Sequence, residues 1–273
     1  MTVRDFMRAL SALSLPRNEA RLLLAHVLHR DHAWLVAHDD YEFTVGELEH
    51  VNALVARRVA GEPIAYLLGE RDFYGRTFRC SPAALIPRPE TELLVERALS
   101  RMPADAALRV LDIGTGTGCV SITIALERPS AIVAAIDISP DALALAQDNA
   151  QRLQANVTFI ESNWLKALLP YAQFDVILSN PPYIVPGDAH LTQGDLRFEP
   201  AVALADAVDG LESYRQLARG AWRHLKPDGV LIVEHGYDQG ESVPALLRAA
   251  GFANVKMHRD LSGQPRITEA HRP

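Results

Sequence analysis

The feature that most constrains the fold is a glycine-rich turn between an apolar run and a helical pattern. Residues 108–113 are typical of a buried strand, and the helical pattern continues to Glu127. The turn between them spans residues 112–118 with the spacing G-x-G-x-G. Glycine permits sharp turns and close approach of a ligand, and a helix N-terminus offers free N–H groups to an anion. The spacing differs from the dinucleotide fingerprint G-x-G-x-x-G, and no Lys-Ser or Lys-Thr pair follows, so a P-loop is not expected.

Short apolar runs and helical patterns alternate through the rest of this region. Ser139 and Pro140 are typical of a helix start, with the hydroxyl as N-cap and the proline at the first helical position. Such an alternation predicts a mostly parallel sheet with helices on both faces. The other expected strands are residues 132–136, 157–160, 174–179 and 230–234, and the other expected helices are residues 91–101, 211–225 and 240–250.

Asp137 follows the expected strand 132–136 and lies 19 residues beyond Gly118. A carboxylate at this place can accept hydrogen bonds from both hydroxyls of a ribose. Together with a glycine-rich turn that lacks the pyrophosphate spacing, it predicts a nucleoside cofactor, for which S-adenosyl-L-methionine is the obvious candidate. The alternative is an ordinary tight connection in which Asp137 only caps the next helix.

A rigid polar turn, Asn180-Pro181-Pro182-Tyr183, follows the expected strand 174–179. Ligands of open α/β sheets bind at the carboxyl ends of strands, and two prolines restrict the backbone there. The Asn180 side chain and the Pro181 carbonyl offer two acceptors to a planar NH2 group, and Tyr183 offers a flat face. This arrangement would aim a poorly nucleophilic nitrogen at a methyl donor. The alternative is a stiff turn with an aromatic lid on the core.

The first 70 residues predict a small helical bundle. Residues 4–13 and the stretch after Pro16 have helical apolar spacing, and Thr44 with Glu47 matches a capping box. An apolar stripe follows the capping box, so this helix needs packing partners. The aromatic residues Phe73, Tyr74 and Phe78 then indicate a short β-hairpin.

The composition excludes several classes. The net charge of −7 argues against a protein that binds nucleic acid directly, and no apolar stretch approaches 18 residues, so no membrane span is expected. Cys80 and Cys119 form no CxxC pair, which indicates a reducing compartment and a cytoplasmic protein. His26, His29 and His32 recur every third residue without a carboxylate to complete a ligand set, so no metal site is expected.

These motifs together resemble the PrmC/HemK family of protein-(glutamine-N5) methyltransferases. The resemblance implies an α/β fold, a seven-stranded Rossmann-like S-adenosyl-L-methionine-dependent methyltransferase domain with a small all-α N-terminal domain. It divides the chain into a helical bundle that binds the release factor (1–72), a β-hairpin linker (73–88) and the methyltransferase domain (89–273). The stretches that carry it are Ile-Pro-Arg-Pro-Glu-Thr-Glu (86–92), the glycine-rich turn (112–118), Asn-Pro-Pro-Tyr (180–183), Asp-Leu-Arg-Phe-Glu-Pro (195–200), Glu-His-Gly (234–236) and Asp-Leu-Ser-Gly (260–263).

The resemblance also implies the roles of individual residues. Many relatives have Asp where this chain has Asn163, which still offers an oxygen to an adenine amino group. Arg88, Glu90 and Phe198 are further candidates for the wall of the site, although Arg88 and Glu90 also suit a surface ion pair. The implied catalytic residues are Asn180, Pro181 and Tyr183; the glutamine pocket adds Pro182; and the implied cofactor-binding residues are Gly114, Thr115, Gly116, Thr117, Gly118, Asp137, Trp164 and Asn180.

The expected reaction is direct transfer of methyl from sulfonium sulfur to the amide nitrogen of the glutamine in the Gly-Gly-Gln segment of class 1 peptide chain release factors. A monomer is expected, since no heptad pattern is present. Two alternatives stay open at this point. One is an adenine-N6 nucleic-acid methyltransferase, because adenine presents a similar planar amine and Asn-Pro-Pro-Tyr is shared with DNA adenine methyltransferases. The other is a non-catalytic adaptor that binds through its helical bundle.

Overall fold

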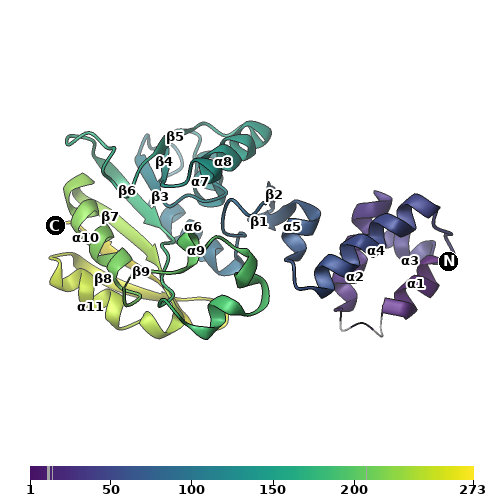
Figure 1. The fold of residues 1–273 in the computed structure, drawn as a ribbon. Coiled ribbons are helices and arrows are strands. Elements are labelled where there is room, and N and C mark those ends of the chain that lie inside the picture. Colours follow the sequence, from purple (N-terminus) through teal and green to yellow (C-terminus); the bar gives the residue numbers. More distant parts are fainter. Residues whose placement is uncertain (11–12, 14, 207) are drawn as a thin grey trace. The chain divides into compact units, whose positions relative to one another are not determined.

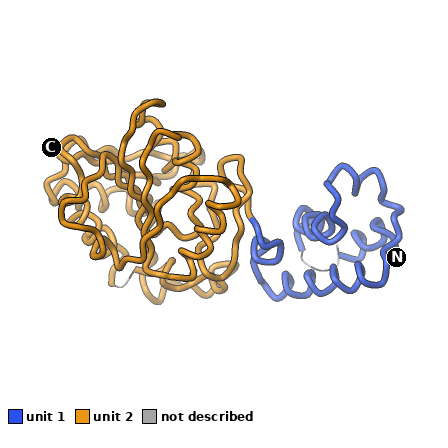
Figure 2. The backbone as a smooth tube through the Cα atoms, turned by 90° about the horizontal axis from the view of Figure 1, so that it is seen from above, with its two compact units in different colours: residues 1–70 blue, residues 71–273 orange. Residues whose placement is uncertain are grey.

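The computed structural model describes residues 1–10, 13, 15–206 and 208–273. The chain forms two compact units, Met1–Glu70 and Arg71–Pro273, drawn in blue and orange in Figure 2. The boundary falls inside a hairpin of two strands, β1 (Glu70–Phe73) and β2 (Arg76–Arg79). Tyr74 and Gly75 form its turn with φ of 50° and 70°, which gives the twist that a two-residue hairpin needs. Strand pairing thus begins three residues before the linker expected at residue 73.

In the described part of the first unit the elements before Glu70 are helices, as its apolar stripe predicted, and one isolated antiparallel bridge joins Thr2 to Glu42. Leu23, Leu24 and Val51 are fully buried at the centre of its own core. The capping box is present: the Thr44 hydroxyl accepts from the Glu47 N–H at 3.3 Å, and the Glu47 carboxylate accepts from the Thr44 N–H at 2.8 Å. Its helices are α1 (Val3–Leu10), α2 (Arg17–Leu28), α3 (His32–Ala37), α4 (Val45–Val59) and α5 (Ile64–Leu68); of the first expected helix, residues 11 and 12 lie outside the described residues.

The second unit is built on one seven-stranded sheet with the order β5-β4-β3-β6-β7-β9-β8 (Figure 1). β3 to β7 are parallel, and β9 pairs antiparallel with both β7 and β8. The chain order reverses between β3 and β6, and ligands of such sheets bind at this switch point. The strands are β3 (Arg109–Ile113), β4 (Ile132–Asp137), β5 (Val157–Glu161), β6 (Phe174–Ser179), β7 (Leu225–Glu234), β8 (Ala253–Arg259) and β9 (Pro265–His271).

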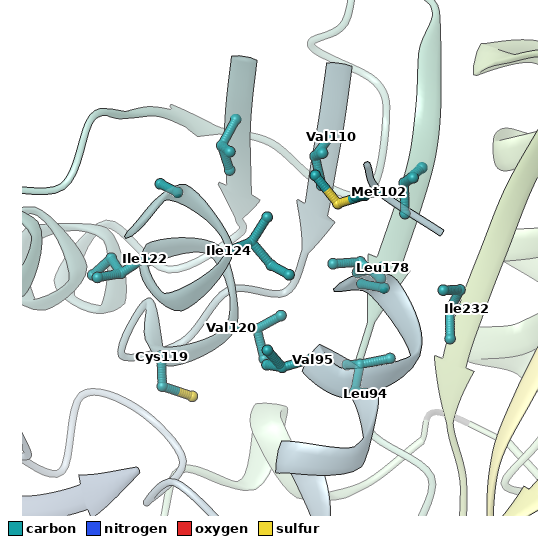
Figure 3. Packing of buried hydrophobic residues seen from close by; sticks show 14 of the residues in the cluster. Leu94, Val95, Met102, Val110, Cys119, Val120, Ile122, Ile124, Leu178 and Ile232 are labelled. Atoms are coloured by element: carbon teal, nitrogen blue, oxygen red, sulfur yellow. The ribbon is translucent and has the colours of Figure 1, made fainter. Parts of the chain in front are cut away.

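Helices cover both faces of this sheet, so its central strands are apolar on both sides. On one face Val110, Leu178 and Ile232 pack with α6, α7 and α8 (Figure 3). The neighbouring strand residues Leu111 and Ile177 point to the other face, against α10 and α11. The helices of this unit are α6 (Glu92–Leu99), α7 (Cys119–Glu127), α8 (Pro140–Leu153), α9 (Ala201–Leu204), α10 (Glu212–His224) and α11 (Ser242–Ala249), with short 3₁₀ turns η1 (Pro89–Thr91), η2 (Ala189–Thr192), η3 (Gly194–Phe198) and η4 (Tyr237–Gln239).

Among the strands of the seven-stranded sheet, β8 and β9 are the two that the residue pattern did not predict; it also did not predict α9. β8 carries Lys256, His258 and Arg259, and it lies at the edge of the sheet, where one face and one side stay open to solvent. β9 contains the fully buried carboxylate of Glu269, which pairs with arginines on α6 and next to it. Charge in both segments therefore obscured the strand pattern. Within the described part of the chain, no helix is long and apolar enough to cross a membrane.

Candidate functional site

A pocket of about 200 Å³ lies at the carboxyl ends of β3, β4 and β6 in the second unit. Its wall brings together most of the residues that the sequence singled out. It also contains Leu85, Ile86 and Pro87 of the segment that follows the hairpin, together with Thr91. Of the predicted site residues, the wall includes Gly114, Thr115, Gly116, Thr117, Asp137, Trp164, Asn180, Pro181 and Pro182, but neither Gly118 nor Tyr183.

The glycine-rich turn exposes its backbone to the pocket. Gly114 and Gly116 have φ of 73° and 56°, a region that side chains with a Cβ rarely adopt. A Cβ on Gly114 would meet no atom within 4 Å, so this stretch of backbone borders open space that a ligand can approach. The turn is also stabilised by a bond between side chains, since the Thr115 hydroxyl donates to the Asp112 carboxylate at 2.7 Å. Burial raises the pKa of Asp112 to about 6.

Gly118 has a packing role that the motif alone did not reveal. Its φ is 80°, and a Cβ there would lie 2.7 Å from Ile122 Cδ1 and 3.1 Å from Ala146 Cβ. Ala146 belongs to α8, so this glycine allows α7 and α8 to approach each other. Gly118 therefore serves the packing of the two helices, and it does not lie on the pocket wall.

Asp137 binds the turn and also faces the pocket. One carboxylate oxygen accepts from the Gly116 N–H at 2.9 Å, and the other accepts from the Ser139 N–H at 3.0 Å. Each oxygen has a further lone pair, so the carboxylate can still accept the two hydroxyls of a ribose. Capping the next helix is a role of Ser139, whose hydroxyl accepts from the Ala142 N–H. The alternative that Asp137 only caps the next helix is therefore wrong, and the carboxylate keeps lone pairs for a ligand.

Trp164 lies on the pocket wall beside Asn163. Its backbone is left-handed, with φ of 53°, and its ring packs against the core under the sheet. A bulky residue with positive φ is unusual, and such strain is concentrated at functional sites. The exposed Asn163 and the indole of Trp164 together suit an adenine, which presents a polar edge and a flat face.

Asn180 is held by a residue that the sequence did not single out. Its side-chain nitrogen donates to the Thr91 hydroxyl at 3.2 Å. Thr91 comes directly before α6 and is 3% exposed. Thr91 belongs to the Ile-Pro-Arg-Pro-Glu-Thr-Glu stretch, so the sequence did point to this segment. The stretch alone does not indicate which of its residues contacts the Asn-Pro-Pro-Tyr turn.

Tyr183 is not among the residues of the pocket wall, and its partly buried side chain packs against the core cluster that contains Tyr214. Burial raises the pKa of the Tyr183 hydroxyl to about 12. Its carbonyl accepts from the Gln239 side chain, which also donates to the Gly210 carbonyl at 2.8 Å. A flat face for the substrate amide is therefore not visible on this wall, and stacking by Tyr183 stays a prediction.

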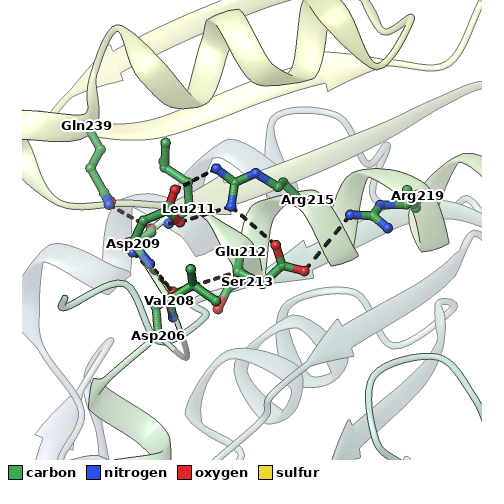
Figure 4. A network of polar contacts seen from close by, with 10 residues as sticks. Asp206, Val208, Asp209, Leu211, Glu212, Ser213, Arg215, Arg219 and Gln239 are labelled. Carbon is green, nitrogen blue, oxygen red and sulfur yellow. Dashed lines mark hydrogen bonds and ion pairs between the residues drawn. The ribbon is translucent and has the colours of Figure 1, made fainter. Parts of the chain in front are cut away.

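The loop that supports Tyr183 is organised by one carboxylate. Asp206 accepts from the backbone N–H groups of Val208, Gly210 and Ser213 at 2.7 to 3.1 Å, and Figure 4 shows this network beside Arg215 and Gln239. Burial would raise the pKa of Asp206, but these backbone bonds outweigh it and the pKa is lowered. The network fixes the place of the Gly210 carbonyl, and through Gln239 it fixes the end of the Asn-Pro-Pro-Tyr turn.

The alternative for Arg88, a surface ion pair with Glu90, is wrong, because Arg88 pairs with a buried carboxylate from another segment. Arg88 pairs with Glu199, whose side chain is fully buried and also accepts from the Ile86 N–H at 2.9 Å. This carboxylate joins two of the stretches that carried the resemblance, residues 86–92 and 195–200. Arg88 lines the pocket, whereas Glu90 and Phe198 do not.

The donors on this wall fit S-adenosyl-L-methionine. The open backbone at Gly114 suits its carboxylate, the Asp137 carboxylate suits its ribose, and Asn163 with Trp164 suits its adenine. Binding these three parts of S-adenosyl-L-methionine needs neither a pyrophosphate site nor a metal ion. Within the residues described, no cluster of three or more His, Cys, Asp or Glu is arranged to hold a metal ion. The histidines of the N-terminal unit do not share a helix, since α2 ends before His29.

Comparisons with known proteins agree with the fold. A methyltransferase-domain family model matches residues 104–263, and a PrmC N-terminal domain model matches residues 3–69. Two solved structures share the fold at 20% identity: a 16S rRNA methyltransferase from T. thermophilus (TM-score 0.56, 75% of this chain and 50% of that chain) and a methyltransferase from Pyrococcus furiosus (TM-score 0.54, 81% and 98%). Sheet and pocket thus define an S-adenosyl-L-methionine-dependent methyltransferase.

Relatives that match over nearly the whole chain identify the family within this class of methyltransferases. The chain is 51% identical to the release factor glutamine methyltransferase of Bordetella pertussis over 254 residues, which are 93% of this chain and 94% of that protein. It is 42% identical to the protein of the same name in Escherichia coli over 267 residues, 97% of this chain and 96% of that protein. The chain belongs to the release factor glutamine methyltransferase family.

Proposed function

We propose that this protein transfers a methyl group from S-adenosyl-L-methionine to the side-chain amide N5 of the glutamine in the Gly-Gly-Gln segment of class 1 peptide chain release factors. The observation that carries the proposal is the place of Asn180 and Pro181 on the pocket wall. Two hydrogen-bond acceptors there match the two protons of a primary amide. The names of the full-length relatives support the same substrate.

The chemistry divides between cofactor and protein. When bound, S-adenosyl-L-methionine supplies a methyl group on a positively charged sulfur. Asn180 Oδ1 and the Pro181 carbonyl accept the two N–H groups of the glutamine amide, which raises electron density on nitrogen and fixes its direction. The carbon–nitrogen bond forms as the carbon–sulfur bond breaks, and the nitrogen then loses one proton to water. No general base has to act before the transfer.

The cysteines take no part in this proposal. Both are buried, and burial raises the pKa of the Cys119 thiol to about 12. A thiol with such a pKa is not a nucleophile at neutral pH, because the thiolate is the reactive form. Direct transfer without a covalent enzyme intermediate is therefore the mechanism that these residues support.

The proposal extends to the binding partner of the protein and to its location in the cell. The helical unit of residues 1–72 contacts the release factor, and residues 89–273 carry the transfer. A cytoplasmic location follows from a substrate that acts during translation, and we propose a monomer that does not bind nucleic acid directly. These points rest on the family and on the acidic net charge of −7.

The test is a methyl-transfer assay with labelled S-adenosyl-L-methionine and a purified class 1 release factor. A factor with Gly-Gly-Ala in place of Gly-Gly-Gln is the matched control. Label on the native factor alone supports the proposal, because it identifies the substrate and the accepting residue together. Label on adenine-containing nucleic acid and none on the factor would instead support the adenine-N6 reaction.

A further inference from the structure

Asn149 of α8 is a polar side chain that lies completely inside the second unit. Its exposed fraction is 0%, and it is not a residue of the pocket wall. Burial of a helix face normally relies on apolar residues, such as Ala146 and Ala150 of the same helix. A buried amide is costly unless its hydrogen-bonding groups have partners, so the partners of Asn149 indicate why it is there.

Among the described residues, three hydrogen bonds reach the Asn149 side chain, and all three come from backbone groups. Its oxygen accepts from the Arg79 N–H at 2.8 Å, and its nitrogen donates to the Arg79 carbonyl at 3.1 Å and to the Thr117 carbonyl at 3.0 Å. A backbone N–H only donates and a carbonyl only accepts, so these partners fix the direction of the amide. Both hydrogens of the NH2 group are used. At this side-chain length, only asparagine offers an acceptor together with two such donors.

The bond to Thr117 fixes one peptide plane of the glycine-rich turn. The carbonyl of Thr117 and the N–H of Gly118 belong to the same trans peptide and point in opposite directions. The N–H donates to the Thr115 carbonyl at 2.9 Å, and the carbonyl accepts from Asn149, so the plane is held from both sides. Thr117 lies on the pocket wall. Its carbonyl is thus directed to a buried donor instead of to the pocket, where it would repel the carboxylate of S-adenosyl-L-methionine.

The bonds to Arg79 fix another part of the pocket wall. Arg79 is the last residue of β2, and residues 83–88, which follow it closely, line the pocket. This segment lies against the glycine-rich turn, because a Cβ on Gly116 would be 3.8 Å from the Cβ of Ala84. Asn149 binds both the N–H and the carbonyl of Arg79, as a residue of a neighbouring strand would. One side chain therefore joins two wall segments that are far apart in the chain.

We propose that Asn149 is a positioning residue for the cofactor, which holds the glycine-rich turn and the end of β2 in the arrangement that S-adenosyl-L-methionine requires. Asn149 is not on the pocket wall, so it acts through these two segments and not on the cofactor itself. The inference rests on the proposed function for the identity of the cofactor, and it does not depend on the methyl acceptor. It also explains why an amide is retained on the buried face of α8.

The neighbouring residue supplies a matched control. Asp148 also binds Arg79, but through the two side chains, with Arg79 Nη1 at 2.9 and 2.8 Å from the two carboxylate oxygens. The exposed fractions of these side chains are 55% for Arg79 and 43% for Asp148, and ion pairs so exposed contribute little. Asp148→Asn therefore weakens a contact between the same helix and the same strand and leaves the backbone partners of Asn149 in place.

The test compares Asn149→Asp with Asp148→Asn. Asn149→Asp keeps the shape and the acceptor for the Arg79 N–H, but it places a carboxylate oxygen against two carbonyls. The Kd of S-adenosyl-L-methionine, measured by calorimetry, should rise about tenfold or more in Asn149→Asp and stay within about twofold of its original value in Asp148→Asn. An unchanged Kd in Asn149→Asp would overturn the proposal.

A general loss of stability has to be distinguished from a misplaced pocket wall. Thr268→Val removes a buried contact of the same unit, since the Thr268 hydroxyl lies 3.0 Å from His235 Nε2 and neither residue lines the pocket. This variant should have a lower Tm, while its Kd stays within about twofold of the original value. If Thr268→Val weakens cofactor binding as much as Asn149→Asp does, lost stability explains both results and the proposal is wrong.

Asn149→Ser keeps the test decisive if Asn149→Asp does not fold. Serine adds no charge, but its shorter side chain does not span the two segments, so Kd should rise about threefold or more. An unchanged Kd in this variant would contradict the proposal. These measurements need no methyl acceptor, so raised Kd values support the inference even if the methyl-transfer assay fails. Unchanged values refute it even if that assay succeeds, and an original protein that does not bind S-adenosyl-L-methionine refutes both proposals.

Discussion

Asn180 is the residue whose removal should separate catalysis from binding. Asn180→Ala is expected to lower kcat by about 100-fold or more, because an oriented acceptor is lost where nitrogen must attack. The Kd of S-adenosyl-L-methionine should rise only a few-fold, since most of the pocket wall comes from other residues. Single-turnover kinetics and calorimetry measure the two quantities. Near-normal turnover would remove the Asn-Pro-Pro-Tyr turn from the chemistry.

Replacement of Asp137 should instead weaken the binding of S-adenosyl-L-methionine. Asp137→Asn replaces one acceptor oxygen by an NH2 group, which opposes either the Gly116 N–H or the Ser139 N–H. Hydrogen bonds to a charged acceptor are worth about 1.5–3 kcal/mol, so the Kd of S-adenosyl-L-methionine should rise about tenfold or more. The exposed Asp141, in the first turn of α8, provides the matched variant Asp141→Asn, which should bind normally. Equal affinities in calorimetry would assign Asp137 to the fold alone.

The carboxyl groups under the site make stability depend on pH. Burial raises the pKa of Glu234 from 4.5 to about 7 and that of Asp112 from 3.8 to about 6, so the native state binds more protons than the unfolded state across this window. The free energy of unfolding should therefore fall as the pH rises from about 4.5 to about 7, with Glu234 alone contributing about 3 kcal/mol. Denaturant titrations at several pH values measure it. Glu234→Gln should flatten the fall, and an identical slope in that variant would refute the assignment.

At the scale of elements, Gly118 tests how closely α7 and α8 must pack. Gly118→Ala forces a Cβ against Ile122 and Ala146 at a φ of 80°, so strain and overpacking add, and the loss of stability should be about 2–4 kcal/mol. Gly263 has the same φ of 80°, but a Cβ there would meet no atom within 4 Å, so Gly263→Ala isolates the backbone strain. Its cost should be about 1 kcal/mol. Equal losses of unfolding free energy in the two variants would show that packing of the helices does not matter.

Elements whose signals are local in the chain were predictable. The strand, turn and helix around Gly114 follow from glycine spacing and apolar runs, and the helix start at Ser139 follows from its own side chain. Contacts between distant segments were not. Thr91 reaches Asn180 only because the start of α6 lies next to the end of β6. No pattern within either segment contains that information.

The direction of a side chain is a second limit on prediction. The sequence identified Tyr183 as part of a rigid turn, but the turn itself allows the ring to face either the substrate or the core. In the structure the ring packs against the core, and the Gln239 side chain, which also donates to the Gly210 carbonyl, donates to the Tyr183 carbonyl. Likewise, the alternation of charge in β8 and the buried Glu269 in β9 become intelligible only once the arginines that pair with Glu269 are known.

At the scale of the whole molecule, the two units have separate cores. The apolar core of the first unit consists of residues between Val3 and Leu68, and both clusters of the second unit consist of residues between Phe73 and Ala270. The pocket lies entirely within the second unit, between Ala83 and Ala203. Neither core contains a buried side chain from the other unit. The second unit should therefore keep its fold when the first is removed.

A fragment that begins at Gly69, one residue before β1, tests this division of labour. It should bind S-adenosyl-L-methionine with a Kd within about threefold of the full chain, because every residue of the pocket wall is retained. Its kcat/KM on a folded release factor should fall about tenfold or more, while its kcat/KM on a short Gly-Gly-Gln peptide should change little. Full activity on the folded factor would remove residues 1–68 from recognition. Loss of cofactor binding would instead mean that the helical unit is needed to stabilise the methyltransferase unit, despite its separate core.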